Sequence, residues 1–149
     1  MSEVELEVID LKEVVLSNNS FGPSDVGSIR SAVSENYGHF GELRDAVNEM
    51  EADDLLSPAG KTKMGVCQFL LGKFSDALRT LQTADGSAMA LFYQARCMFE
   101  LGSYDGAVGV YEKAQTSGYN EDQCKIGVAE AYRYAGRIEE ALAILDNIF

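Results

Sequence analysis

A pattern of small and large residues recurs three times around a glycine, and this recurrence restricts the possible fold more than any other feature. The glycines are Gly72, Gly102 and Gly136, and each lies between two runs of residues with helical periodicity. In each copy, small residues stand seven and five positions before the glycine, a bulky apolar residue two positions after it, and an alanine five positions after it. Small residues let helices approach closely, and glycine allows a left-handed backbone at a helix end. The sequence therefore predicts antiparallel helix pairs, which must stack to bury their apolar faces.

These segments resemble the tetratricopeptide repeat. The interval from Gly102 to Gly136 is 34 residues, the period typical of that family, and the preceding interval is 30 residues. The segment 102–114 is similar to the family's second-helix pattern, although no copy has the tryptophan usual in the first helix. The resemblance covers residues 58–149 clearly and residues 24–51 faintly. It implies an all-α fold, a right-handed α-solenoid of antiparallel helix pairs.

The chain is expected to divide into three parts. These are an acidic N-terminal helix in residues 1–22, a degenerate capping helix pair in residues 23–57, and three repeats at residues 58–87, 88–121 and 122–149. The helices are expected near residues 3–17, 24–37, 40–52, 58–71, 74–84, 88–101, 104–117, 121–135 and 138–149. The alternation of Val4, Leu6 and Val8 leaves a short strand open as an alternative for the first segment.

Three helix starts carry residues that favour a cap. Ser24 can cap the second helix, and Ser57 followed by Pro58 is a favourable start for the fourth. Asn120 with Gln123 resembles a capping box at the start of the last pair.

An excess of acidic residues argues against two classes of partner. The chain has 24 acidic and 12 basic residues and a net charge of −12. Nucleic acids and anionic membrane surfaces attract clustered lysine and arginine, so neither is expected to bind. The charge is uneven, because residues 1–57 hold 13 acidic and 3 basic residues, net −10, and residues 58–149 hold 11 and 9, net −2. The acidic character therefore belongs to the N-terminal third.

No residue pattern predicts a catalytic or metal site. Residues 60–62, Gly-Lys-Thr, resemble the end of a phosphate-binding loop, but Leu55 stands where that loop needs another glycine. His39 is the single histidine and is expected to face solvent. The three cysteines form no Cys-x-x-Cys pattern, and Cys67 and Cys97 occupy equivalent packing positions in neighbouring repeats. We expect no enzyme activity, no cofactor and no metal.

The first helix of the middle repeat, residues 88–101, carries the best candidate for a binding surface. It is apolar nearly all round, which indicates burial on more than one side. In the tetratricopeptide family the first helices line a concave groove, and the resemblance implies peptide contacts at equivalent positions of each copy. The candidate binding residues are Val66, Phe69, Phe92, Arg96, Phe99, Ile126, Glu130 and Arg133. The alternative is that the molecule's own packing covers Phe92 and Phe99.

The predicted function is a protein-binding module or scaffold that holds a peptide or an amphipathic helix. A basic, apolar ligand is expected, because the acidic N-terminal third attracts positive charge over distance. Binding of chaperone tails is not expected, since the family's clamp for C-terminal carboxylates uses lysine and asparagine, which the candidate positions lack. The alternative is a structural role, either homo-oligomerisation or a segment of a longer repeat protein, because residues 141–149 end apolar without a polar capping helix. With no signal peptide or membrane-spanning run in the sequence, the cytoplasm is the expected location.

Overall fold

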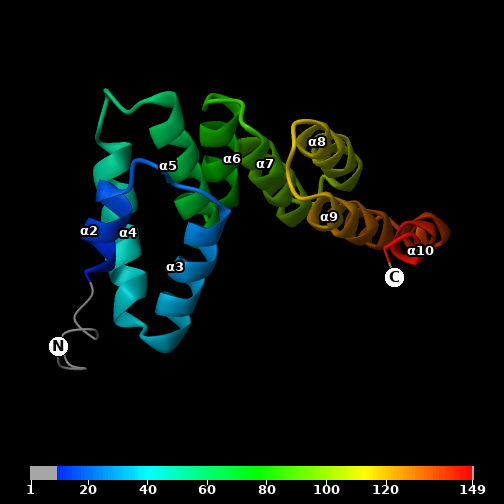
Figure 1. The fold of residues 1–149 in the computed structure, drawn as a ribbon, viewed down its shortest axis with the longest axis horizontal. Coiled ribbons are helices and arrows are strands. Elements are labelled where there is room, and N and C mark those ends of the chain that lie inside the picture. Colours follow the sequence, from blue (N-terminus) through cyan, green and yellow to red (C-terminus); the bar gives the residue numbers. More distant parts are fainter. Residues whose placement is uncertain (1–9, 149) are drawn as a thin grey trace.

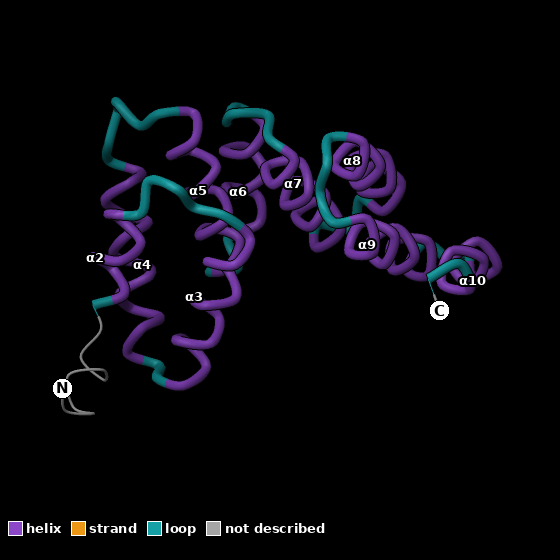
Figure 2. The backbone as a smooth tube through the Cα atoms, in the orientation of Figure 1, coloured by secondary structure: helices purple, strands orange, loops and turns teal. Residues whose placement is uncertain are grey.

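The structure, a computed structural model, describes residues 10–148, which form helices and no strand and confirm the all-α prediction. The helices follow one another as antiparallel neighbours along a bent row (Figures 1 and 2). Their bounds are α2 Leu11–Ser17, α3 Pro23–Glu35, α4 Gly38–Glu51, α5 Pro58–Leu70, α6 Phe74–Gln82, α7 Ala88–Glu100, α8 Tyr104–Thr116, α9 Glu121–Tyr134 and α10 Ile138–Asp146. No helix in this part of the chain is long and apolar enough to cross a membrane.

The three recurrent glycines all occupy the same kind of helix end. Gly72, Gly102 and Gly136 have φ angles of 81°, 85° and 84°, a left-handed conformation that a side chain would strain. After α5, the Gly72 N–H donates to the Phe69 carbonyl and the Lys73 N–H donates to the Gln68 carbonyl, each at 2.9 Å. The same two bonds recur after α7 and α9. Each glycine therefore closes a Schellman motif that reverses the chain into the second helix of its pair.

Close approach of the helices depends on the small residues that the sequence pattern predicted. Ala77 and Ala107, five positions after their glycines, have no exposed surface. A Cβ atom placed on Gly65 would lie 2.6 Å from the Leu81 side chain, so α5 and α6 could not keep their present spacing. One continuous apolar core runs through the repeats, and Tyr111 is its largest fully buried side chain.

The N-terminal part has a second core and a different arrangement. The short helix α2 covers α4 on the side away from α3, and α4 packs more extensively on α2 than on α3 (Figure 1). Leu11 and Val15 of α2 lie with Leu43 and Val47 of α4 in this core. Helices α3 and α4 run antiparallel but diverge, and this divergence leaves room for a pocket between them.

Charged side chains hold α2 at both of its ends. At its start, the Leu11 N–H donates to the Glu42 carboxylate of α4 at 2.6 Å. At its end, the Lys63 ammonium of α5 donates to the carbonyls of Val15 at 2.7 Å and Asn18 at 2.9 Å. An anion at a helix start and a cation at its end both complement the helix dipole. These contacts place a seven-residue helix that would be marginal by itself.

Two local predictions in this part are wrong. Helix α3 begins at Pro23 instead of after Ser24, because Asp25 accepts a bond from the Gly22 N–H and fixes the start there. His39 does not face solvent, since its side chain is only 12% exposed and its Nδ1 lies 2.7 Å from a Glu42 carboxylate oxygen. The caps predicted at Ser57 and Asn120 are confirmed by bonds to the N–H groups of the third helical residues. The first helix was predicted from residue 3. Residues 3–9, where a short strand was the alternative, lie outside the described residues.

Candidate functional site

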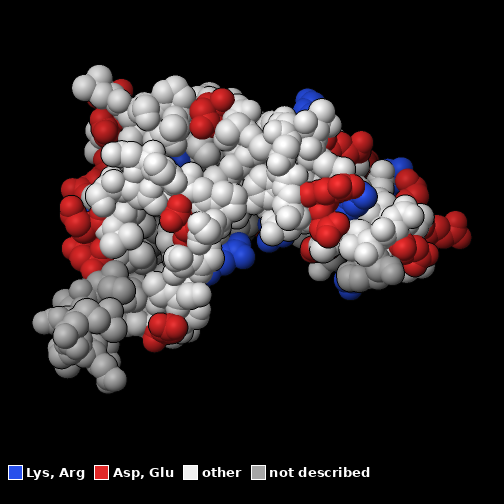
Figure 3. Space-filling model, viewed as in Figure 1, with Lys and Arg blue, Asp and Glu red and all other residues white. Residues whose placement is uncertain are grey.

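Three pockets lie along one face of the molecule, which we call the concave face. The first, of about 560 Å³, lies between α3, α4 and the α5–α6 turn; the second, of about 250 Å³, lies between α3, α7, α8 and α9; and the third, of about 320 Å³, lies between α9 and α10. The outline of the molecule is notched where the second pocket lies, between α3 on one side and α9 on the other (Figures 1 and 3).

Neighbouring pockets share lining residues, and we call the three pockets together the trough. Arg30 of α3 lines both the first and the second pocket. Ile126 and Glu130 of α9 line both the second and the third. An extended segment lying in this trough would therefore meet α3, α7, α9 and α10 in sequence.

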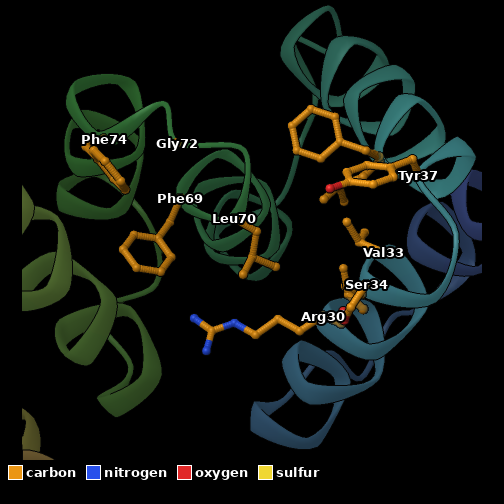
Figure 4. Close-up of a pocket in the computed structure, with 11 residues that line it drawn as sticks. Arg30, Val33, Ser34, Tyr37, Phe69, Leu70, Gly72 and Phe74 are labelled. Atoms are coloured by element: carbon orange, nitrogen blue, oxygen red, sulfur yellow. The ribbon is translucent and has the colours of Figure 1, made fainter.

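The first pocket is mainly apolar and is drawn in Figure 4. Val33 on α3, Leu70 on α5 and Phe74 on α6 contribute apolar side chains to it. The Arg30 side chain extends from α3 toward the α5 side of the pocket (Figure 4). Tyr37, at the α3–α4 turn, is 91% exposed, so it is available to a ligand at the pocket mouth.

The aromatic side chains at the centre are largely occupied by the molecule's own packing. Phe92 is only 7% exposed, because its ring stacks on Tyr119 with centroids 4.2 Å apart and meets Tyr93 edge-on at 5.2 Å. Phe69 packs against Tyr93 at 5.4 Å in the same way. These rings form the floor of the trough, and they have little surface left to anchor a ligand.

Six of the eight predicted binding residues line the trough. Those in its pockets are Phe69, Phe92, Arg96, Ile126, Glu130 and Arg133. Val66 is a correction, since it has no exposed surface and cannot touch a ligand. Phe99 lines none of these pockets; its ring is half-buried between Tyr104, at 5.6 Å, and Tyr134, at 5.0 Å. The alternative that the molecule's own packing covers these rings therefore holds in large part for Phe92 and in part for Phe99.

The arginines that line the trough differ from the other arginines in their ion pairs. Arg44, Arg79 and Arg137, which lie outside the trough, each form an ion pair with a carboxylate. Within residues 10–148, the three trough arginines, Arg30, Arg96 and Arg133, form none. Glu130 is the single carboxylate lining the three pockets, so the trough is locally positive in a protein of net charge −12. In Figure 3 lysine and arginine gather in the notch, whereas acidic residues cover the outer side of α2 and α4.

Neighbouring aromatic rings hold two of these guanidinium groups. Arg96 lies over the Phe69 ring at 5.6 Å from its centroid, and Arg133 lies over Tyr134 at the same distance. Burial raises the pKa of Tyr111, in the second pocket, to about 12, while the nearby Arg96 charge acts in the opposite direction. The Tyr111 hydroxyl is therefore protonated at neutral pH, but Tyr111 is only 1% exposed, so the arginines are the polar groups that a ligand can reach. This chemistry suits recognition of an anionic or polar group.

The described residues contain no cluster of three or more histidine, cysteine or acidic side chains that could hold a metal ion. The three cysteines are free and buried. Burial raises the pKa of Cys67 and of Cys97 to about 12 each, so neither thiol is a nucleophile at neutral pH.

Sequence reasoning missed the contribution of α3 and α4 to this surface. Arg30, Val33 and Tyr37 stand on a helix whose repeat pattern is degenerate, so alignment to the other copies assigns them no groove position. One signal was present, since Arg30 is one of only three basic residues in the first 57. An isolated cation in an acidic segment favours a specific role for that side chain.

Comparisons with known proteins agree with this architecture. The family model of the tetratricopeptide repeat matches residues 89–117, which span α7 and α8. The crystal structure of MamA protein superposes with a TM-score of 0.63 at 17% identity, over 81% of this chain and 77% of that one. A mutant of MamA superposes with a TM-score of 0.58 at 16% identity, over 97% of this chain and 96% of that one. No curated protein sequence matches the chain significantly.

Proposed function

We propose that the concave face binds a segment of another protein, as a peptide or an amphipathic helix, because α7 and α8 match the tetratricopeptide-repeat family model. The role is that of a binding module or scaffold without catalytic activity. The observation that carries the proposal is the continuity of the trough, in which Arg30 connects the first pocket to the second and Ile126 connects the second to the third.

The apolar part of the binding energy comes from the two ends of the trough. Tyr37 and Phe40 are exposed at the first pocket, and Ile138 and Leu142 are exposed at the third. Burial of apolar surface stabilises a complex by roughly 25 cal/mol per Å², so these side chains are the natural anchors. Phe92, in contrast, belongs to the core, and its replacement by alanine is expected to lower stability as well as affinity.

The proposal is tested by photo-crosslinking from inside the trough. A benzophenone amino acid at position 126, whose side chain is exposed and shared by two pockets, reports on a bound segment. The control is the same probe at position 55, which is 93% exposed in the loop between α4 and α5. We expect a saturable adduct from position 126 and none from position 55 in extract of the source cells. Equal yields from both positions, or no adduct at either, would contradict a binding role for the concave face.

A second candidate function, self-association, is favoured by one observation at the C-terminal edge. Leu142 of α10 is 53% exposed beside the third pocket, together with Ile138. If two copies join through this edge, the mass measured by light scattering falls on dilution, and Leu142→Glu gives a monomer. A mass that is monomeric and independent of concentration excludes this role for the isolated chain.

A further inference from the structure

We propose that Arg30 and Arg96 together bind an acidic side chain within the partner segment, so that the ligand has a carboxylate at its centre and apolar residues on both sides. This inference rests on the proposed function, because it assigns ligand chemistry to the same trough. The net charge of the chain is negative and predicts a basic ligand, but the charged side chains that line the trough are mainly arginines. We therefore infer an acidic ligand group in place of a basic one.

The pairing pattern of the arginines is the first argument. A folded chain with 24 acidic and 12 basic residues offers every surface cation many possible carboxylate partners. The arginines outside the trough have taken such partners, as in the pair of Arg137 with Asp105 at 3.1 Å. In the part of the chain that the structure covers, Arg30 and Arg96 have not. Their donors are therefore available to an external carboxylate.

The second argument is that the two side chains reach one pocket from different parts of the fold. Arg30 comes from α3 and Arg96 from α7, and both line the second pocket. The Arg96 guanidinium carbon lies over the Phe69 ring, 5.6 Å from its centroid, and the group has five N–H donors, so this single ring contact leaves donors for a carboxylate. Guanidinium groups bind carboxylates through paired, charge-assisted hydrogen bonds, so two of them converging on one pocket form a specific site.

Glu130 determines which side of the second pocket favours a ligand carboxylate. It lies on α9 at the boundary of the second and third pockets, so it repels a carboxylate placed on the α9 side and favours one placed on the α3 side. The preferred position for the ligand's acidic group is therefore between Arg30 and Arg96.

The carboxylate belongs to a side chain rather than to a C-terminus, because the trough continues in both directions. An apolar pocket lies beyond Arg30, lined by Val33, Leu70 and Phe74, and another lies beyond Ile126. A ligand that ended at the arginines would fill only one of them. A ligand that passes through fills both, which buries more apolar surface for the same charge contact.

The test uses a synthetic peptide library. Each member is about 15 residues long, carries apolar-weighted random flanks around one central glutamate, and has matched members with glutamine or lysine at the centre. Equilibrium affinities are measured by fluorescence anisotropy for the full chain, for Arg30→Gln, for Arg96→Lys and for Arg96→Gln. Arg79→Gln is the matched control, because Arg79 is exposed on α6 and lines none of the trough pockets.

For the parent protein and for Arg79→Gln, we expect glutamate peptides to bind about tenfold more tightly than their glutamine counterparts, with lysine peptides weakest. In Arg30→Gln the preference for glutamate over glutamine falls to about threefold or less. Arg30 is exposed, so its replacement does not disturb the core. Arg96→Lys retains the charge and part of the preference, and Arg96→Gln loses it.

The outcomes separate this inference from the function on which it rests. Peptides that bind the trough without preferring glutamate overturn the carboxylate site and leave the proposed function intact. A library with no binders overturns both. If preference for glutamate survives in both glutamine variants, the site lies elsewhere. If binding disappears when the peptide C-terminus is amidated, the group recognised is a terminal carboxylate. The inference that a side-chain carboxylate is bound within a continuous ligand segment is then wrong.

Discussion

The repeats and the N-terminal part of this molecule are held together in different ways. Helices α5 to α10 approach closely because glycine, alanine and cysteine recur at fixed places, and their turns repeat one hydrogen-bond pattern three times. Helices α2 to α4 lack that regularity. There, Lys63 and Glu42 bind the two ends of α2 across 48 and 31 residues of sequence. The packing of the repeats is therefore determined by residues close together in the sequence, whereas the N-terminal part depends on particular long-range contacts.

The binding surface needs both kinds of structure. Its floor is formed by the repeats, with Arg96 on α7 and Ile126 on α9, and its remaining wall is formed by α3. A change that loosens the N-terminal part would open this wall without unfolding the repeats. The comparison therefore leads to tests that affect one region and spare the other.

The largest single effect is expected from Lys63→Met. Lys63 is 7% exposed and its ammonium donates to three carbonyl groups at the end of α2, so the substitution removes all three of these bonds. Breaking such a site costs about 3 kcal/mol of unfolding free energy. Hydrogen exchange of α2 amides is expected to accelerate while the repeat amides keep their protection. Lys61→Met on the same helix is the control, and equal effects of the two changes would refute the capping role of Lys63.

A smaller loss, about 2 kcal/mol, is expected from Ala107→Leu, because the added atoms force α7 and α8 apart. Ala107 has no exposed surface, whereas Ala143 on α10 is exposed and serves as the matched control for the same substitution. Denaturant unfolding measures both. An unchanged midpoint for Ala107→Leu would refute the repeat alignment.

Gly127→Ala is expected to cost about 1 kcal/mol, because its new Cβ would lie 2.5 Å from the Tyr111 ring and α8 and α9 would have to separate. Gly109→Ala makes the same exchange where no atom lies within 4 Å, and helix propensity predicts a gain of up to about 1 kcal/mol there. Thermal unfolding of the two variants compares them directly. Shifts of the same sign would show that close packing is not what requires glycine at position 127.

The stability of the buried cores is also expected to depend on alkaline pH. Burial raises the pKa of Cys67, Cys97 and Tyr111 to about 12 in the folded protein, above the ordinary values of 9.0 for cysteine and 10.0 for tyrosine. Between about pH 9 and pH 12 the folded state binds more protons than the unfolded state, so stability falls as pH rises through that range. Urea unfolding at a series of pH values measures the slope. A flat profile would contradict burial of these groups.

The fold was largely predictable because the helix pairs depend on residues that lie close together in the sequence. Small residues at fixed distances from Gly72, Gly102 and Gly136 predicted the helix pairs, and the structure has them. The contacts of Lys63 were not predictable, since α2 meets α5 only in the folded arrangement. The contact of His39 was missed although its partner, Glu42, lies three residues further along the same helix.

The binding surface was predictable only in part. Repeat equivalence selected Arg96, Ile126 and Glu130, and all three line the second pocket. It could not show that Tyr119, from the connection after α8, stacks on Phe92 and covers it. It also could not locate Arg30, because the bend that brings α3 opposite α7 is a property of the stacked helices and not of any single repeat.

The most direct test of the binding surface is a methyl nuclear magnetic resonance titration with the tightest glutamate peptide. Isoleucine and leucine methyl groups lie along the trough, at Ile29 and Leu70 in the first pocket and at Ile126 and Leu142 toward the other end. The account predicts saturable shifts at these four positions and none at Leu55. Shifts confined to Leu55 and the outer side of the helices, or no shifts at all, would contradict it.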